Sequence, residues 1–130
     1  PQPVGRKLQG VSRDVVAKMD ILIIDEVSMV RADLLDAIDE SLRTNTGKTG
    51  VPFGGKTVLL IGDMHQLPPV ISGGEEARLF EEVYESPYFF SAYCLQGLPL
   101  VTRILTQSFR QADEAFVAIL NDLRVGENLE

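Results

Sequence analysis

The sequence predicts an α/β fold in which a mainly parallel sheet is flanked by helices. Two short runs are continuously apolar and rich in residues that favour strands, residues 21–24 (Ile-Leu-Ile-Ile) and 58–61 (Val-Leu-Leu-Ile). Strands that are buried on both faces have this composition, and parallel sheets provide that setting. Segments with apolar residues at helical spacing alternate with these runs, which is typical of a layered sheet with crossover connections.

The first half of the chain predicts a lead-in segment, a strand, a helix and a loop. Residues 1–19 are a polar lead-in made of helix or loop. Residues 20–25 predict a buried strand that ends in an acid. Residues 31–43 predict an amphipathic helix, because four leucine or isoleucine residues recur there at helical spacing. Residues 44–55 are rich in Gly, Thr and Lys and predict an exposed loop.

The second half continues this alternation. Residues 56–62 predict a second buried strand, and residues 77–84 predict a short helix. Residues 87–98 contain four aromatic side chains and leave a strand, a helix or both in succession open; we expect the aromatics to fill the core beneath the last helix rather than to stack on bases. Residues 100–106 are a third strand candidate. Residues 114–125 predict an amphipathic helix that is followed by a capping glycine.

Composition limits the class of protein. The 130 residues make one domain, and residues 127–130 include a possible vector-derived tail. No apolar run approaches the roughly 20 residues of a membrane span, and no signal peptide is recognisable. A single cysteine, Cys94, excludes an internal disulfide and fits a reducing compartment: the cytoplasm of a bacterium, or the nucleus or mitochondrion of a eukaryote. The net charge of −7 predicts weak or no DNA binding by this chain alone.

An acid pair, Asp25-Glu26, directly follows the first apolar run. Carboxyl ends of parallel strands are where ligands bind in α/β sheets. A carboxylate there suits magnesium, which keeps most of its waters, and a second acid can deprotonate an attacking water. The alternative is that Asp25 caps a helix and Glu26 is a solvated acid in its first turn.

The second strand leads into an unusual string, Gly62-Asp63-Met64-His65-Gln66-Leu67-Pro68-Pro69-Val70. Gly62 lets the chain turn without a clash at Cβ. Asp63 can tie the turn or approach the water shell of a metal. Gln66 offers both a donor and an acceptor to a terminal phosphate and its attacking water. The alternative is a well-made surface loop.

These segments resemble motifs II and III of the PIF/RecD-type superfamily-1 DNA helicases, and Leu105-Thr106-Gln107-Ser108-Phe109-Arg110-Gln111 is similar to motif IV. The resemblance covers residues 20–126. It implies part of a RecA-like fold of the P-loop NTPase class, from the first motor domain. It also implies an enzyme that uses ATP and Mg²⁺ to unwind DNA five-prime to three-prime on single-stranded DNA, in telomere maintenance, DNA repair and recombination.

The resemblance assigns roles to individual residues. Asp25 would hold the magnesium ion through water, and Glu26 would be the general base. Asp63 and Gln66 would bind nucleotide, with Gln66 sensing the γ-phosphate. Arg110 would reach the γ-phosphate and stabilise developing charge, a task suited to its planar, permanently charged fork; outside this family it would be an ordinary surface ion pair.

Four further residues receive weaker assignments. His65, Pro68 and Pro69 are candidates for DNA contacts. A zinc site at His65 is not expected, because no Cys or His lies at metal spacing from it. Cys94 is expected to be a small buried apolar residue and not a nucleophile.

The chain departs from the family in one respect. It contains no Gly-x-x-x-x-Gly-Lys-Ser/Thr, and the triplet Gly47-Lys48-Thr49 lacks the earlier glycine because position 42 is Leu. The isolated chain is therefore expected to be inactive. The family places the phosphate-loop strand between residues 56–62 and residues 100–105, so sheet edges would stay unpaired or pair anew, and self-association is expected. A non-helicase P-loop ATPase and a degenerate interaction module are the alternatives.

Overall fold

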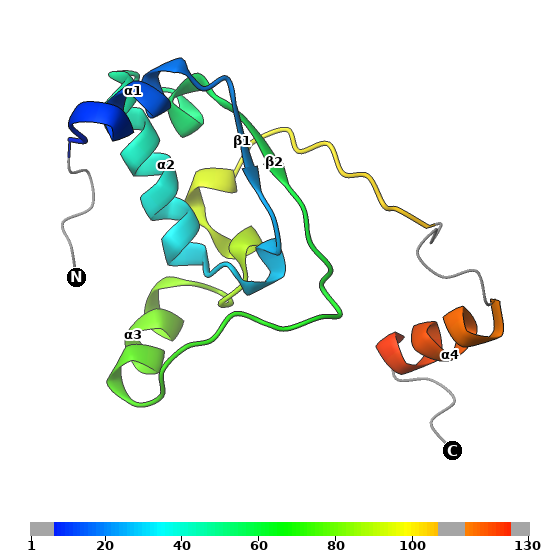
Figure 1. The fold of residues 1–130 in the computed structure, drawn as a ribbon. Helices are drawn as coiled ribbons and strands as arrows, with labels where there is room; N and C mark the ends of the chain where they lie inside the picture. Colours follow the sequence, from blue (N-terminus) through cyan, green and yellow to red (C-terminus); the bar gives the residue numbers. More distant parts are fainter. Residues whose placement is uncertain (1–6, 107–113, 126–130) are drawn as a thin grey trace. The chain divides into compact units, whose positions relative to one another are not determined.

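The computed structural model describes residues 7–106 and 114–125, in two compact units that divide after Leu98 (Figure 1). The first unit contains α1 (Gly10–Lys18), β1 (Ile21–Ile24), η1 (Val27–Met29), α2 (Ala32–Thr46), η2 (Pro52–Gly55), β2 (Thr57–Leu60), α3 (Glu75–Val83), η3 (Phe89–Ser91) and η4 (Tyr93–Leu95), where η marks a 3₁₀ turn. The second unit contains α4 (Glu114–Val125). No described helix is long and apolar enough to cross a membrane.

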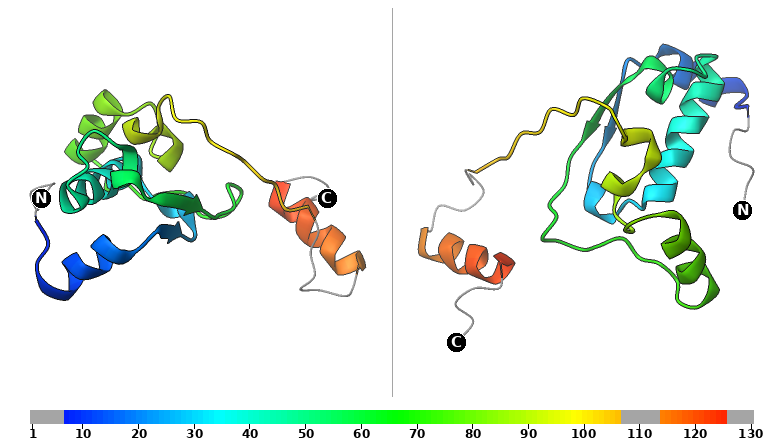
Figure 2. Two further views of the ribbon diagram at one scale, coloured as in Figure 1. Left: turned by 90° about the horizontal axis from the view of Figure 1, so that it is seen from above. Right: turned by 180° about the vertical axis from the view of Figure 1, so that it is seen from behind.

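The two strands are parallel, as the sequence predicts. They pair in register from Ile21 with Thr57 to Ile24 with Leu60. Their side chains alternate between the core and the solvent. Figures 1 and 2 show α2 running along one side of the sheet.

Burial of the strands on both faces was the wrong expectation. Leu22, Ile24, Val58 and Leu60 pack against the core. On the other face Ile23 is 59% exposed and Leu59 is 48% exposed. The reason is that α2 and its neighbours pack on one face only, so half of each apolar run stays accessible.

The core of the first unit is centred on α2. Leu35 and Leu42 of this helix are buried and Ile38 packs against the core, as the helical spacing of its apolar residues predicts, and Ala32 is buried as well. Leu34, the fourth residue of the predicted pattern, is 51% exposed. Partners come from segments far apart in the sequence: Phe53 from η2, Phe80 from α3, and Ala92 and Leu95 around η4.

The predicted exposed loop at residues 44–55 is partly wrong. α2 continues to Thr46, and Gly47 ends it in the left-handed conformation. Phe53 is only 5% exposed, because its backbone N–H donates to the carboxylate of Asp39 and its ring joins the core. Gly54 also has a positive φ, and a Cβ there would lie 2.7 Å from the carbonyl oxygen of Leu42.

Residues 87–98 form two 3₁₀ turns, η3 and η4, which resolves the open choice in favour of neither strand nor regular helix. The expectation that the aromatic residues fill the core is only partly confirmed. Phe89 packs against the core, whereas Phe90 is 52% and Tyr93 is 53% exposed. Tyr93 stacks at a tilt on Tyr84 with ring centroids 5.2 Å apart. Packing beneath the last helix stays a prediction, since α4 belongs to the other unit.

The third strand candidate, residues 100–106, forms no strand. Val101, Ile104 and Leu105 are 79%, 81% and 91% exposed, and none of the described segments pairs with this one. A strand needs a hydrogen-bonded neighbour, and the phosphate-loop strand that the resemblance places beside it is not among the 130 residues. The edges of the described sheet are consequently left unpaired. The predicted last helix is confirmed as α4.

Candidate nucleotide-hydrolysis site

The segments that follow β1 and β2 are joined by backbone hydrogen bonds. The N–H of Ile61 donates to the carbonyl oxygen of Ile24 at 2.9 Å, and the N–H of Val27 donates to the carbonyl oxygen of Ile61 at 2.9 Å. These bonds hold the Asp25-Glu26 turn against the strand that leads to Asp63. The two acidic strand ends therefore lie at the same edge of the parallel sheet.

Asp25 and Glu26 are both exposed at this edge. Oδ1 of Asp25 accepts a hydrogen bond from the N–H of Glu26 at 2.9 Å. Glu26 has φ 51°, in the left-handed region that a non-glycine residue adopts at a cost. Glu26 precedes η1, and neither acid caps that turn through its side chain. The exposed acid pair directly precedes two buried residues, Val27 and Ser28.

Asp63 orders its own turn. Its Oδ1 accepts a hydrogen bond from the N–H of His65 at 3.0 Å, and its Oδ2 accepts one from Nε2 of Gln66 at 3.3 Å. The N–H of Gln66 also donates to the carbonyl oxygen of Asp63 at 3.1 Å. The amide of Gln66 is thus held by Asp63, and among the described residues no hydrogen bond joins it to Asp25 or Glu26.

The remaining candidates fall in different places. His65 and Pro68 are exposed, whereas Pro69 is buried, so only the first two are accessible to a nucleic acid in this structure. Arg110 lies outside the described residues. Cys94 is half-buried and close to the core, as expected for a structural cysteine.

Val27 and Ser28, which the sequence analysis did not assign to the site, lie against Gly62. A Cβ on Gly62 would lie 3.0 Å from the backbone nitrogen of Val27 and 3.1 Å from that of Ser28. The clash that the sequence predicts at Gly62 is therefore with the turn after the acid pair. Ser28 is 1% exposed, and its hydroxyl has no hydrogen-bond partner among the described residues. A small polar residue within an apolar turn was the available signal for Ser28.

The acids fit magnesium better than a metal that needs a full protein cage. The described residues contain no group of three or more His, Cys, Asp or Glu side chains that could hold a metal ion. Magnesium is held by one or two carboxylates together with waters and substrate phosphates. Asp25, an exposed residue whose Oδ1 accepts from the Glu26 N–H, matches that requirement.

Comparison with solved structures defines the class of protein. The chain aligns with a Pif1 helicase from Bacteroides, solved in complex with ADP-AlF3 and single-stranded DNA, at a TM-score of 0.85 and 38% identity over 92% of this chain and 28% of that one. A Pif1 helicase from Candida albicans aligns at a TM-score of 0.69 and 31% identity, over 87% of this chain and 23% of that one. The fold is that of a RecA-like helicase domain, as the resemblance implies.

Sequence comparison gives the family. A model of the PIF1-like helicase family matches residues 6–130. The chain is 40% identical to the ATP-dependent DNA helicase RRM3 of Saccharomyces cerevisiae, over 82% of this chain and 14% of that protein. It is 36% identical to the ATP-dependent DNA helicase PIF1 of Homo sapiens, over 81% of this chain and 15% of that protein. The chain belongs to the PIF1-like helicase family, and it spans about a seventh of these relatives' length.

Proposed function

We propose that this chain is the part of an ATP-dependent DNA helicase that supplies the acidic residues for ATP hydrolysis. The observation that carries the proposal is the acid pair at the end of β1, bonded through Val27 and Ile61 to the strand that leads to Asp63. Membership of the PIF1-like helicase family supports it, and so do the names of the relatives. The complete protein would use ATP hydrolysis to move on single-stranded DNA and unwind duplex DNA five-prime to three-prime.

Asp25 and Glu26 divide the chemistry between them. Asp25 would hold magnesium through a water molecule. Magnesium, when bound with ATP, neutralises the charge that develops on the transferred phosphoryl group. Glu26 would take a proton from the attacking water at its carboxylate. Its left-handed backbone and exposed side chain support this role, since the carboxylate is free of the core.

Gln66 and Arg110 would act on the γ-phosphate. Nε2 of Gln66 donates to Asp63, so the amide oxygen of Gln66 would be available to accept a hydrogen bond from the attacking water. A change in the bond between Gln66 and Asp63 would transmit the presence of the γ-phosphate to His65 and Pro68. Arg110 would stabilise the phosphoryl oxygens in the transition state. His65 and Pro68, exposed on the same turn, are the accessible candidates for DNA contact. The isolated chain would hydrolyse ATP negligibly, because it has no phosphate-binding loop.

The test is Glu26→Gln in the complete helicase that contains this chain. Loss of a general base lowers kcat by about 100-fold or more, while ATP binding is retained because the amide keeps the size of the carboxylate. DNA-stimulated ATP turnover and strand separation are measured together, and both should fall. Glu82→Gln, at an exposed position on α3, is the matched control and should retain both. Turnover within about threefold of the unmodified protein for Glu26→Gln would contradict the proposed role.

A further inference from the structure

We infer that Gly62 is a positioning residue for the hydrolysis reaction, because the turn after Glu26 occupies the space that a Cβ at position 62 would need. This inference depends on the proposed role of Glu26 as general base. Gly62 follows β2 in the chain, and the inference gives it no contact with substrate. It would act on the reaction only through the position of Glu26.

Glu26 is held in place through its backbone. Among the described residues, Glu26 forms hydrogen bonds through its backbone. Its N–H donates to Oδ1 of Asp25, and its carbonyl oxygen accepts from the N–H of Met29 at 3.0 Å. The next two residues, Val27 and Ser28, are 4% and 1% exposed. The carboxylate is therefore placed by the backbone of a buried turn rather than by contacts of its own.

The turn after Glu26 is held mainly by close packing against Gly62. One hydrogen bond, from the N–H of Val27 to the carbonyl oxygen of Ile61, joins it to the end of β2. The Ser28 hydroxyl adds no bond to a described residue. Close packing supplies the rest, since an ideal Cβ on Gly62 would be 3.0 Å from both N and Cγ1 of Val27 and 3.1 Å from N of Ser28. Only glycine allows this approach.

A side chain at position 62 would displace this turn. Gly62 has no positive φ, so an alanine there is opposed by the contact and not by its own backbone. Two of the three atoms it meets are backbone nitrogens, which cannot rotate away as a side chain can. The turn must shift by a few tenths of an ångström and carry Glu26 with it. Because a misplacement of about 1 Å can cost about 100-fold in rate, we expect a loss of about 5- to 10-fold.

The experiment uses Gly62→Ala in the complete helicase. The expected result is a kcat for ATP lowered about 5- to 10-fold, with KM for ATP and the melting temperature almost unchanged. Gly73→Ala is the matched control, because a Cβ there has open space and an ordinary φ; its kcat should equal that of the unmodified protein. A folded Gly62→Ala protein with unchanged kcat overturns the inference, and so does a loss that appears in KM and melting temperature rather than in kcat.

Two further variants separate the possible failures. Val27→Ile crowds the same contact from the opposite side and should also lower kcat at constant KM. If Gly62→Ala does not fold, Val27→Ile tests the inference in its place. An unchanged kcat in Val27→Ile then overturns the inference. Glu26→Gln is measured in parallel: if it stays active, the proposed function has failed, whereas an inactive Glu26→Gln beside a fully active Gly62→Ala refutes the positioning role alone.

Discussion

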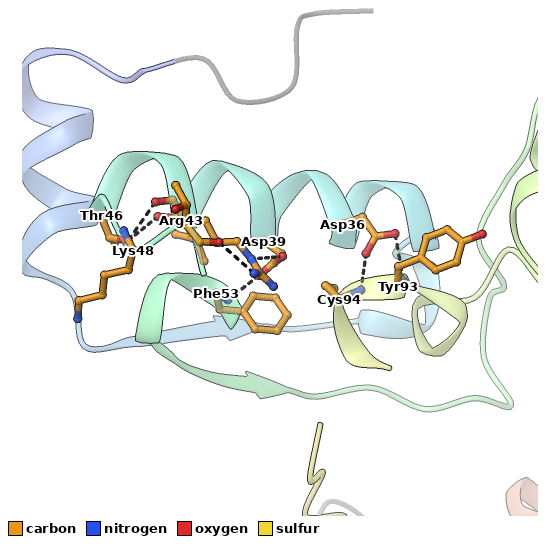
Figure 3. A network of polar contacts seen from close by, with 10 residues as sticks. Asp36, Asp39, Arg43, Thr46, Lys48, Phe53, Tyr93 and Cys94 are labelled. Carbon is orange, nitrogen blue, oxygen red and sulfur yellow. Dashed lines mark hydrogen bonds and ion pairs between the residues drawn. The ribbon is translucent and has the colours of Figure 1, made fainter. Parts of the chain in front are cut away.

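Asp36, on the core-facing side of α2, joins three elements through one carboxylate. Its Oδ2 accepts hydrogen bonds from the hydroxyl of Tyr84 at 2.9 Å and from the N–H of Tyr93 at 3.1 Å, and its Oδ1 accepts from the N–H of Cys94 at 2.8 Å. Figure 3 shows the carboxylate pointing at η4. The carboxylate accepts from the first two N–H groups of η4, whereas the hydrogen bonds within η4 begin with the N–H of Leu95, which donates to the carbonyl oxygen of Ala92.

This arrangement suppresses ionisation of two neighbours. Burial raises the pKa of the Cys94 thiol well above its ordinary value of 9.0, and the Asp36 carboxylate raises it further. Burial and then Asp36 likewise raise the pKa of the Tyr84 hydroxyl above its ordinary 10.0. Since both pKa values are raised in the folded state, their contribution to stability is fully present below pH 9 and is lost as the pH rises toward the folded-state pKa values.

At the residue scale we predict that Asp36→Asn makes Cys94 more reactive. Removing the negative charge favours the thiolate and lowers the pKa of Cys94. The rate of alkylation by iodoacetamide, followed at Cys94 by mass spectrometry, should stay low through pH 9 in the unmodified chain and rise at lower pH in the variant. Asp14→Asn, on an exposed position of α1, is the control. Identical pH profiles for the unmodified chain and Asp36→Asn would show that Asp36 does not raise the pKa of Cys94.

At the scale of elements, α2 holds the 47–56 segment in place. Oδ2 of Asp39 accepts from Nε of Arg43 at 2.6 Å, while its Oδ1 accepts from the N–H of Phe53. Nη1 of Arg43 in turn donates to the carbonyl oxygen of Thr49 at 3.2 Å. Figure 3 shows this chain of contacts running from α2 into η2. A helix side chain thereby satisfies the donor of a buried turn.

We predict that Asp39→Ala destabilises the chain by about 1–3 kcal/mol, because it leaves the buried N–H of Phe53 without an acceptor. Urea denaturation followed by circular dichroism measures the change. Asp39→Asn keeps one acceptor oxygen and should cost less, and Asp14→Ala on α1 should be neutral. A stability for Asp39→Ala equal to that of the Asp14 control would show that Phe53 does not depend on this contact.

The elements differ in how far the sequence alone could predict them. The runs in β1 and β2 and the spacing in α2 and α4 are local patterns, and each predicted its element. The burial of Phe53 depends on a carboxylate 14 positions away, which no local pattern contains. Residues 100–106 have a strand's composition but no strand, since pairing needs a neighbour that composition does not supply.

The residues of the site also divide into those that a local sequence pattern predicts and those that depend on tertiary contacts. Asp25 and Glu26 were predicted because they end an apolar strand, and their position beside the strand to Asp63 follows from parallel pairing. The contact between Gly62 and the turn after Glu26 could not be predicted, because it depends on how closely two loops approach after their strands end. The order of residues in the sequence identified the two loops. Only their packing in three dimensions shows that the turn after Glu26 lies against the backbone at Gly62.

At the scale of the molecule, the outer face of the sheet is an exposed apolar surface of the first unit. It carries four large apolar side chains with 44% to 59% exposure: Ile21, Ile23, Leu59 and Ile61. The two strands that bear them also have unpaired outer edges within the described sheet. Contiguous apolar surface and free strand edges both favour association with another chain.

We predict that the isolated chain self-associates through this face, and that Leu59→Lys weakens the association. A lysine at the centre of the face places a charge where a second copy would have to remove it from water, and the strand pairing of β2 is kept. Static light scattering across a range of concentrations measures the mass. Val11→Lys adds the same charge on α1 at a position that is 80% exposed, and should leave the association unchanged. A strictly monomeric unmodified chain at high concentration would mean that the face is covered within one molecule, and an equal effect of the two lysines would mean that net charge, rather than the sheet, controls the mass.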